Sequence, residues 1–470
     1  LSLNKETVCY EEWGNLGVIC QAARDVIHLE DETKKVYPEL SNALDDLRSE
    51  KLEEMDTFMS NFLEQAQEAD GIRDDFYGYT SECEFFVQRA DDQILSIRET
   101  YYEYNDGARP MSGNFGENYD PVTGKELLIT DVVKDLSELI RLLDETLLEK
   151  YGEDAFYDSP KELMEEYSPE YFQWTLSYQG LSVYFGSTDV GAYGINQHMI
   201  TIGFDENPEL FVEKYMVQLE TDYVMSVPAN EEITININPG DGEKDTLRLW
   251  NESEDLYSKL VFQINGQDYY SEEIYLISDS SYYLSCLKNG EEEKYYIYAQ
   301  LGYELFNQLQ VYELTDKGVI YQGGLEQTYV PGEWNSETES YFMDVFNNPS
   351  EFELYSRTDW VGVVTGVRTY QADWENPVPK ALTDDYDISN EWYTLTLKRA
   401  MEFEILPDGN IEEIPAGTTF QYLRTDNETY VDLLMEDGRE CRVYTENWDG
   451  EAGIQGYYPD LCFDGLPNGF

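Results

Sequence analysis

One stretch in the middle of the chain, residues 171–204, constrains the fold more than any other, because its side chains alternate between apolar and polar. The first apolar series is Phe172, Trp174, Leu176 and Tyr178, and after the turn Gln179-Gly180 the series resumes at Leu181, Val183 and Phe185. A period of two is what a half-buried β-hairpin requires. Beyond Gly191 and Gly194 the period returns at Ile200, Ile202 and Phe204. The stretch therefore predicts three strands with a glycine-rich crossing.

Helical patterns precede this hairpin. Apolar residues recur three and four positions apart at Leu40, Leu44, Leu47, Met55, Phe58, Met59, Phe62, Leu63 and Ala66. This spacing is typical of an amphipathic helix. A second helix is expected over residues 132–147, and Ser159-Pro160-Lys161-Glu162 has the sequence of a capping box. A short helix is also expected over residues 209–216. The first domain is therefore predicted to be α+β, an antiparallel sheet with helices on one face.

Beyond residue 216, short alternating runs and turns such as Asn265-Gly266 and Asn289-Gly290 predict all-β structure. We divide the chain into an α+β domain (1–215), a β sandwich or propeller-like domain (216–330), a linker and strand segment (331–390) and a small SH3-like β-barrel (391–470). In the third segment, NNPSEF (347–352) is linker-like and residues 360–371 are expected to form a strand pair. The SH3-like assignment is a similarity of pattern.

The sequence GLSVYFGSTDVGAYGINQHMITIGF resembles the extracytoplasmic domain shared by RsiV-type anti-sigma factors and the N-terminal part of PdaC-type peptidoglycan deacetylases. Asp189, Val190, Ala192 and Tyr193 match the middle of that pattern. The preceding segment from Asp91 to Val133 is also similar, with Asp120, Thr123, Gly124 and Lys125 at the family's "D..TGK" turn. The resemblance covers residues 35–215. Where the family has a "GGAH"-like turn, this chain has Asp106-Gly107-Ala108-Arg109.

The charge of the chain is extreme, since 97 acidic residues face 30 basic ones and leave a formal net charge of −67. Such a surface repels nucleic acids and anionic membranes, and it attracts cationic proteins or divalent ions. A well-solvated, soluble surface explains the same charge without any partner.

The six cysteines are scattered and contain no CxxC pair, which argues against a zinc site or a disulfide framework. Cys9 with Cys20, and Cys441 with Cys462, are the two pairings that the sequence leaves open. The chain begins at Leu1 and has no long apolar run. We expect an extracellular or cell-surface anchored protein whose signal segment or lipid anchor has been removed.

Candidate chemistry is sparse. The two histidines are His28 and His198, and the second lies in an alternating strand, so a structural role is favoured over general base catalysis. No nucleophile, phosphate-binding or zinc-protease motif is present. We expect no catalytic residue and no cofactor except for weak Ca²⁺ ligand candidates, Asp241, Glu243 and Asp426. The binding candidates are Asp189, Tyr193, Arg109, Tyr101 and Tyr102.

Forty tyrosines, several in doublets, suit either half-exposed strands or a surface that stacks on sugars. Our prediction is a non-catalytic cell-surface binding protein. The resemblance implies a cationic protein such as lysozyme as partner, because the RsiV-type domain is a receptor for lysozyme. The alternative is a peptidoglycan- or glycan-binding accessory module, and a more remote one is a cell-wall glycan hydrolase.

Overall fold

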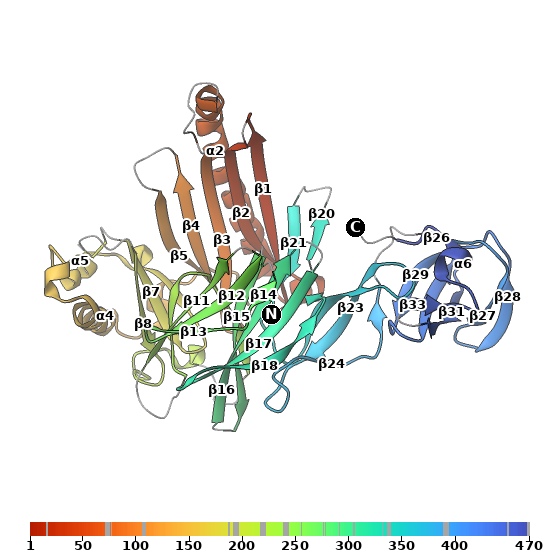
Figure 1. Cartoon of the computed structure of the whole chain (residues 1–470). Coiled ribbons are helices and arrows are strands. Elements are labelled where there is room, and N and C mark those ends of the chain that lie inside the picture. Colours follow the sequence, from red (N-terminus) through yellow and green to blue (C-terminus); the bar gives the residue numbers. More distant parts are fainter. Residues whose placement is uncertain are drawn as a thin grey trace.

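The computed structural model places a helix-backed sheet, a β-rich middle and a C-terminal β lobe along the chain, and Figure 1 shows that lobe (blue) set apart from the rest. It describes residues 1–15, 17–70, 76, 78–105, 110–186, 189–190, 197–216, 222–237, 244–254, 256–275, 277, 279–290, 292–303, 306–330, 332–335, 340–388, 394–448 and 451–467. The α+β class of the first region and the all-β class of the rest are as the sequence predicts.

The first sheet has seven strands in the order β20-β21-β1-β2-β3-β4-β5. The strands are β1 (Leu3–Trp13), β2 (Val18–Leu29), β3 (Tyr79–Ala90), β4 (Leu95–Tyr104) and β5 (Met111–Tyr119), with β20 (Gly332–Asn335) and β21 (Ser340–Asp344) at one edge. The sheet is not purely antiparallel, because β2 pairs with β3 in parallel. The cause is the long helix α2 (Pro38–Asp70), which returns the chain to the end of the sheet where β2 began.

Helix α2 confirms the predicted amphipathic stripe. Its buried residues are Leu40, Leu44, Leu47, Lys51, Met55, Phe58, Met59 and Ala66, and Figure 1 shows the helix beside β1, β2 and β3. Seven of these eight are the apolar positions expected from the sequence. The eighth, Lys51, is a cation on the face that packs against the sheet.

The predicted three-stranded unit is present as β6 (Gln173–Leu176), β7 (Gly180–Gly186) and β8 (Gln197–Gly203). It shares one hydrophobic core with α3 (Ile129–Val132), α4 (Leu136–Tyr151) and α5 (Pro160–Glu165). Ser159 caps α5 by accepting a hydrogen bond from the backbone N–H of Glu162, as its sequence predicts. The predicted helix over 209–216 is wrong. There Val212 N–H donates to Val132 O in an extended pairing, and only the 3₁₀ turn η3 (Glu213–Tyr215) forms.

This small sheet sits tightly on β5. A Cβ on Gly116 would lie 1.7 Å from the carbonyl oxygen of Trp174, so only glycine permits the approach. The buried Asn118 donates to the same carbonyl at 2.7 Å, and Ser96 links Asn118 to the backbone N–H of Leu176. Polar contacts and a glycine therefore fix the two sheets against each other.

The middle of the chain is a sandwich. One sheet contains β10 (Glu232–Ile235), β11 (Asp245–Glu254), β12 (Tyr257–Ile264), β13 (Gln267–Tyr270) and β14 (Ile274–Tyr275). The other contains β9 (Tyr223–Val227), β15 (Asp279–Asn289), β16 (Glu292–Tyr303), β17 (Phe306–Thr315) and β18 (Gly318–Glu326). Residues of both sheets form one core, among them Leu249, Phe262, Leu284 and Ile297.

Residues 331–390 are more than a linker. Strand β21 pairs with β1 and so belongs to the first sheet, whereas β22 (Phe352–Thr358) and β23 (Val364–Gln371) belong to the last. The expected strand pair within 360–371 is wrong, because β23 pairs with β22, which begins in the linker-like NNPSEF piece. The exact domain boundaries remain predictions.

The C-terminal lobe is all-β. Its strands are β26 (Thr394–Leu397), β27 (Met401–Ile405), β28 (Asn410–Ile414), β29 (Thr419–Thr425), β30 (Tyr430–Met435) and β31 (Glu440–Tyr444), which enclose one core. Cys441 and Cys462 both lie in that core as free thiols. Cys9 is exposed and Cys20 is buried beneath Met59, so neither of the two pairings exists in the structure.

Candidate functional site

An acidic groove lies between α2, β4, β5 and the start of β6, with a cavity volume of about 880 Å³. Its acidic lining residues are Glu50, Glu53, Glu54, Glu99, Glu103, Glu117, Glu126 and Glu170. The basic residues of the lining are Arg24 and Lys51. The groove is therefore strongly negative even by the standard of this chain.

Strand periodicity places the acids on one face. Glu99, Tyr101 and Glu103 alternate along β4 and so point the same way, and Phe115 and Glu117 do the same on β5. Residue Glu99 is registered with Phe115 in the β4–β5 ladder. The Tyr101 hydroxyl donates to the carboxylate of Glu103, and burial together with that carboxylate raises the pKa of Tyr101 to about 12. The phenol therefore stays protonated.

The two cations of the groove are already engaged. Lys51 Nζ lies 2.8 Å from Glu99 Oε2, with only 8% and 5% of the two side chains exposed. Burial opposes the charge on Lys51, but Glu99 outweighs it and holds the pKa of Lys51 above its usual value. The Arg24 guanidinium donates to the carbonyl and hydroxyl of Ser81. Both cations also lie near Glu54, with Arg24 Nε at 4.0 Å and Lys51 Nζ at 3.7 Å from its carboxylate.

The surroundings of Glu117 in the groove change the pKa of its carboxyl group. Burial, with a further contribution from the negative charge of Glu99, raises the pKa of Glu117 to about 7. The Tyr119 hydroxyl donates to Glu117 Oε2 at 3.0 Å. The charge of the groove therefore changes near neutral pH.

Aromatic rings line the same groove, namely Phe58, Phe62, Tyr101, Phe115, Phe172 and Trp174. Acids beside aromatic faces suit a long cationic side chain, because its methylenes pack on the rings while its charged end meets carboxylates. The groove therefore combines carboxylates and aromatic faces in one lining.

One of the binding candidates predicted from the sequence lies in this groove. Tyr101 lines it, whereas Tyr102 is the next residue on the strand and is 40% exposed beside a different hollow that includes Lys150. Asp189 lies in the turn after β7, where its carboxylate accepts a hydrogen bond from Gly186 N–H at 2.6 Å. The structure thus does not bring Asp189 together with Tyr101. Tyr193 and Arg109 lie outside the described residues, and all five binding roles remain predictions.

Lys51, Glu99 and Glu117 are residues of the groove that were not predicted from the sequence. A signal for Lys51 was available, since position 51 continues the helical stripe between Leu47 and Met55. A lysine there must reach a carboxylate across the sheet. No comparable local signal marks Glu117.

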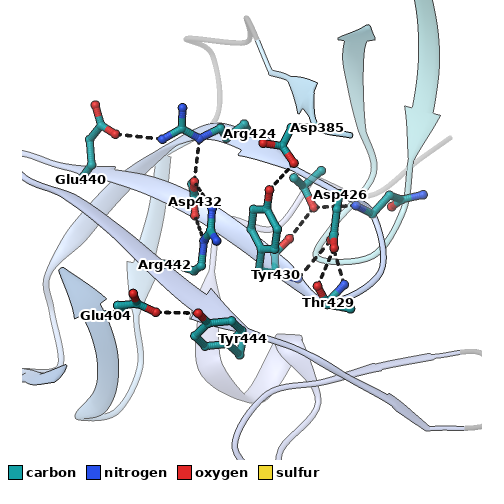
Figure 2. A network of polar contacts seen from close by, with 12 residues as sticks. Asp385, Glu404, Arg424, Asp426, Thr429, Tyr430, Asp432, Glu440, Arg442 and Tyr444 are labelled. Carbon is teal, nitrogen blue, oxygen red and sulfur yellow. Dashed lines mark hydrogen bonds and ion pairs between the residues drawn. The ribbon is translucent and has the colours of Figure 1, made fainter. Parts of the chain in front are cut away.

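Among the calcium candidates, Asp241 and Glu243 lie outside the described residues. Asp426 closes the turn between β29 and β30, where Oδ1 accepts from the backbone N–H groups of Glu428, Thr429 and Tyr430 (Figure 2). Burial raises the pKa of Asp426, but these bonds outweigh it and the pKa ends below its usual value. No cluster of three metal-ligating side chains occurs in the part of the chain that the structure describes.

Figure 2 also shows a buried carboxylate clamp in the C-terminal lobe. Asp432 is fully buried, and both Arg424 and Arg442 bind it, at 2.7 and 2.6 Å. The Arg442 guanidinium lies 3.5 Å from the centre of the Tyr430 ring. All of its charges are paired within β29, β30 and β31, so the clamp holds three strands together and offers no free group to a ligand.

Within the described ranges, every helix is too short or too polar to cross a lipid bilayer.

No protein-family model and no curated protein match this sequence. Solved structures do show similarity. One is a member of the DUF3298 family from Bacteroides fragilis, with 16% identity and a TM-score of 0.33 over 45% of this chain and 94% of that chain. Another is a DUF3298 family protein from Pseudomonas aeruginosa, with 16% identity and a TM-score of 0.28 over 45% and 95%. Structural similarity to DUF3298 family proteins thus extends over less than half of the chain.

Proposed function

We propose that this protein is a non-catalytic binding protein whose acidic groove takes a basic segment of a cationic protein. The observation that carries the proposal is the lining of the groove, in which eight glutamates face two cations that are already engaged. Within the described residues, Glu50, Glu53 and Glu126 form no ion pair, so an arriving lysine or arginine would find their carboxylates available.

The charge of the whole molecule favours the same partner. A formal charge of −67 attracts a basic protein over distances of about 10 Å at 0.1 M salt, and this speeds association. The groove then adds specificity, because its carboxylates are ordered on strands and a helix. The proposal also agrees with the resemblance of residues 35–215 to the RsiV-type domain, for which lysozyme is the partner. Cell-surface or extracellular placement belongs to the same proposal.

The experiment is a calorimetric titration with lysozyme at about 20 mM and about 300 mM salt. The groove variant carries Glu50→Gln, Glu53→Gln and Glu126→Gln. The matched control carries the same charge change on exposed residues of the C-terminal lobe, as Glu413→Gln, Glu436→Gln and Glu451→Gln. We expect binding at low salt that the groove variant weakens about tenfold and the control about twofold or less.

Absence of binding at low salt would overturn the choice of partner. Equal weakening by both triple variants would overturn the groove itself, because it would show attraction by net charge alone.

A second function, glycan binding, is favoured by one cluster. Tyr257 and Tyr275 form an edge-to-face pair on the sandwich surface, and Tyr270 is exposed on the neighbouring strand β13. Stacking of sugar rings on tyrosine survives high salt. Retention on purified cell wall at about 0.5 M salt, lost in Tyr257→Ala and Tyr275→Ala, would support this function over the first.

A further inference from the structure

A small polar cavity lies where the β6–β7 turn meets the sandwich. Its volume is about 100 Å³, and its walls come from the Gln179 turn, the end of β8, strand β9, strand β16 and the end of β10. This cavity is separate from the acidic groove, and the two share no lining residue.

Three buried polar atoms in this wall lack a partner within the described residues. They are Gln179 Nε2, Asn236 Oδ1 and the hydroxyl oxygen of Tyr223. Tyr223 is 2% exposed, and although Tyr295 and Cys286 lie near it, its hydroxyl makes no hydrogen bond of normal geometry. Each such atom costs free energy unless something fills its hydrogen-bonding capacity. Three of them around one cavity indicate a ligand or ordered water.

The two lysines in the wall are paired already. Lys244 Nζ lies 2.7 Å from Glu206 Oε2 and donates to the Thr201 carbonyl at 2.9 Å. Deeper in the wall, Lys288 pairs with Glu293 at 2.8 Å, and the Tyr295 hydroxyl donates to the same carboxylate at 2.6 Å. An anionic ligand would therefore have to break an existing pair, whereas a neutral one would not.

The wall is also rigid and aromatic. The Tyr178 and Tyr223 rings stack with centroids 4.4 Å apart. Phe204 N–H donates to Gln179 O at 3.0 Å, and a Cβ on Gly180 would lie 2.3 Å from Ile202 O. The backbone therefore holds the Gln179 side chain in place beside flat apolar surface.

We propose that this cavity binds a small neutral amide group, such as the acetamido or carboxamide end of a larger molecule. Gln179 Nε2 would donate to the amide oxygen of the ligand, Asn236 Oδ1 would accept from its N–H, and the Tyr223 hydroxyl would bind either atom. The tyrosine pair would cover the apolar side of the group. A volume near 100 Å³ suits an amide of a few heavy atoms, since a cavity of about 150 Å³ holds benzene.

The test is saturation-transfer NMR with pairs of probes that differ in the amide. N-acetylglucosamine is compared with glucose, and glutamine with methionine, so that the two pairs distinguish a sugar source from a side-chain source. We expect one amide probe to bind with a Kd of about 1–10 mM and its partner without the amide to show no transfer.

Gln179→Met and Asn236→Leu should each weaken that binding about tenfold or more while leaving the melting temperature unchanged or raised, because they remove unpartnered polar atoms. Tyr223→Phe is a conservative third variant, and Gln421→Met, on an exposed strand of the C-terminal lobe, is the matched control.

The groove variant should bind the amide normally, so failure of this proposal and failure of the proposed function are distinguishable. Absence of transfer from every amide probe, or unchanged binding in the variants, would overturn the proposal and leave water alone in the cavity.

Discussion

Glu117 shows how a single residue can make the groove sensitive to pH. Its pKa of about 7 in the folded chain exceeds its usual value of 4.5 because of burial, and so the folded state keeps a proton that the unfolded state has lost. This contribution to stability is complete below about pH 4.5 and disappears as the pH rises through 7. At pH 8 the ionised Glu117 is instead a cost to the fold.

We therefore predict that Glu117→Gln stabilises the protein by about 1–2 kcal/mol at pH 8 and has almost no effect at pH 5, a range reduced for partial exposure of the side chain. Urea unfolding at the two pH values measures the difference. Glu413→Gln, which is exposed, serves as the control. An equal effect of Glu117→Gln at both pH values would contradict the assignment.

Residues differ in how far the sequence alone reveals their role. Lys51 interrupts an apolar stripe, and this local pattern is sufficient to predict a buried cation with a carboxylate partner. The perturbation of Glu117 depends on Glu99 of the neighbouring strand and on the helix above it. Those distances are set by tertiary packing, which a one-dimensional pattern does not contain.

At the scale of elements, one buried carboxylate joins four of them. Glu6 of β1 is bound by His28 of β2 at 2.8 Å, by Arg48 of α2 at 2.8 and 3.0 Å, and by the Ser340 hydroxyl of β21 at 2.7 Å. This places His28 in a structural role. Burial opposes the charge of Glu6, but the bonds from His28, Arg48 and Ser340 outweigh it and hold the pKa of Glu6 well below its usual range.

Glu6→Gln should destabilise the protein by about 2–4 kcal/mol at pH 7, because it leaves buried donors without their charged acceptor. Since the folded pKa is lowered, the stability that Glu6 contributes is present above about pH 4.5 and is lost as the pH falls further. Urea unfolding between pH 7 and pH 3 should show the wild type and Glu6→Gln converging at low pH. Glu68→Gln, on the exposed face of α2, should follow the wild type throughout. Parallel curves for wild type and Glu6→Gln would contradict this account.

The Glu6 network also shows which structural features the sequence predicts and which it does not. Helix α2, the capping box at Ser159 and the strands β6, β7 and β8 follow from periodicity and capping, which are local. The bond from Ser340 to Glu6 spans 334 residues, and nothing in the pattern of residues 340–344 names β1 as their partner. The expected helix over 209–216 failed for the same reason, because its backbone pairs with residues 132–133 at the end of α3.

At the scale of the whole molecule, the basic residues are too few to neutralise the acidic ones. Even if all 30 basic residues were paired one to one, 67 carboxylates would be left without a basic partner. The buried Asp432 uses two arginines, which increases the excess elsewhere. The folded chain is therefore under self-repulsion that the expanded chain relieves.

Screening should thus stabilise the fold, and we predict that the melting temperature rises by several degrees between about 0.02 M and about 0.5 M NaCl. Choline chloride at equal ionic strength separates general screening from binding of a particular cation, and it should give the same rise. Calcium chloride at matched ionic strength should raise the melting temperature little further, because the Asp426 carboxylate already accepts hydrogen bonds from the backbone of its own turn. A far larger rise with calcium would contradict this interpretation of Asp426 and point to a specific divalent site. A melting temperature independent of salt would contradict the self-repulsion, because it would show that solvation of the acidic surface already compensates for its charge.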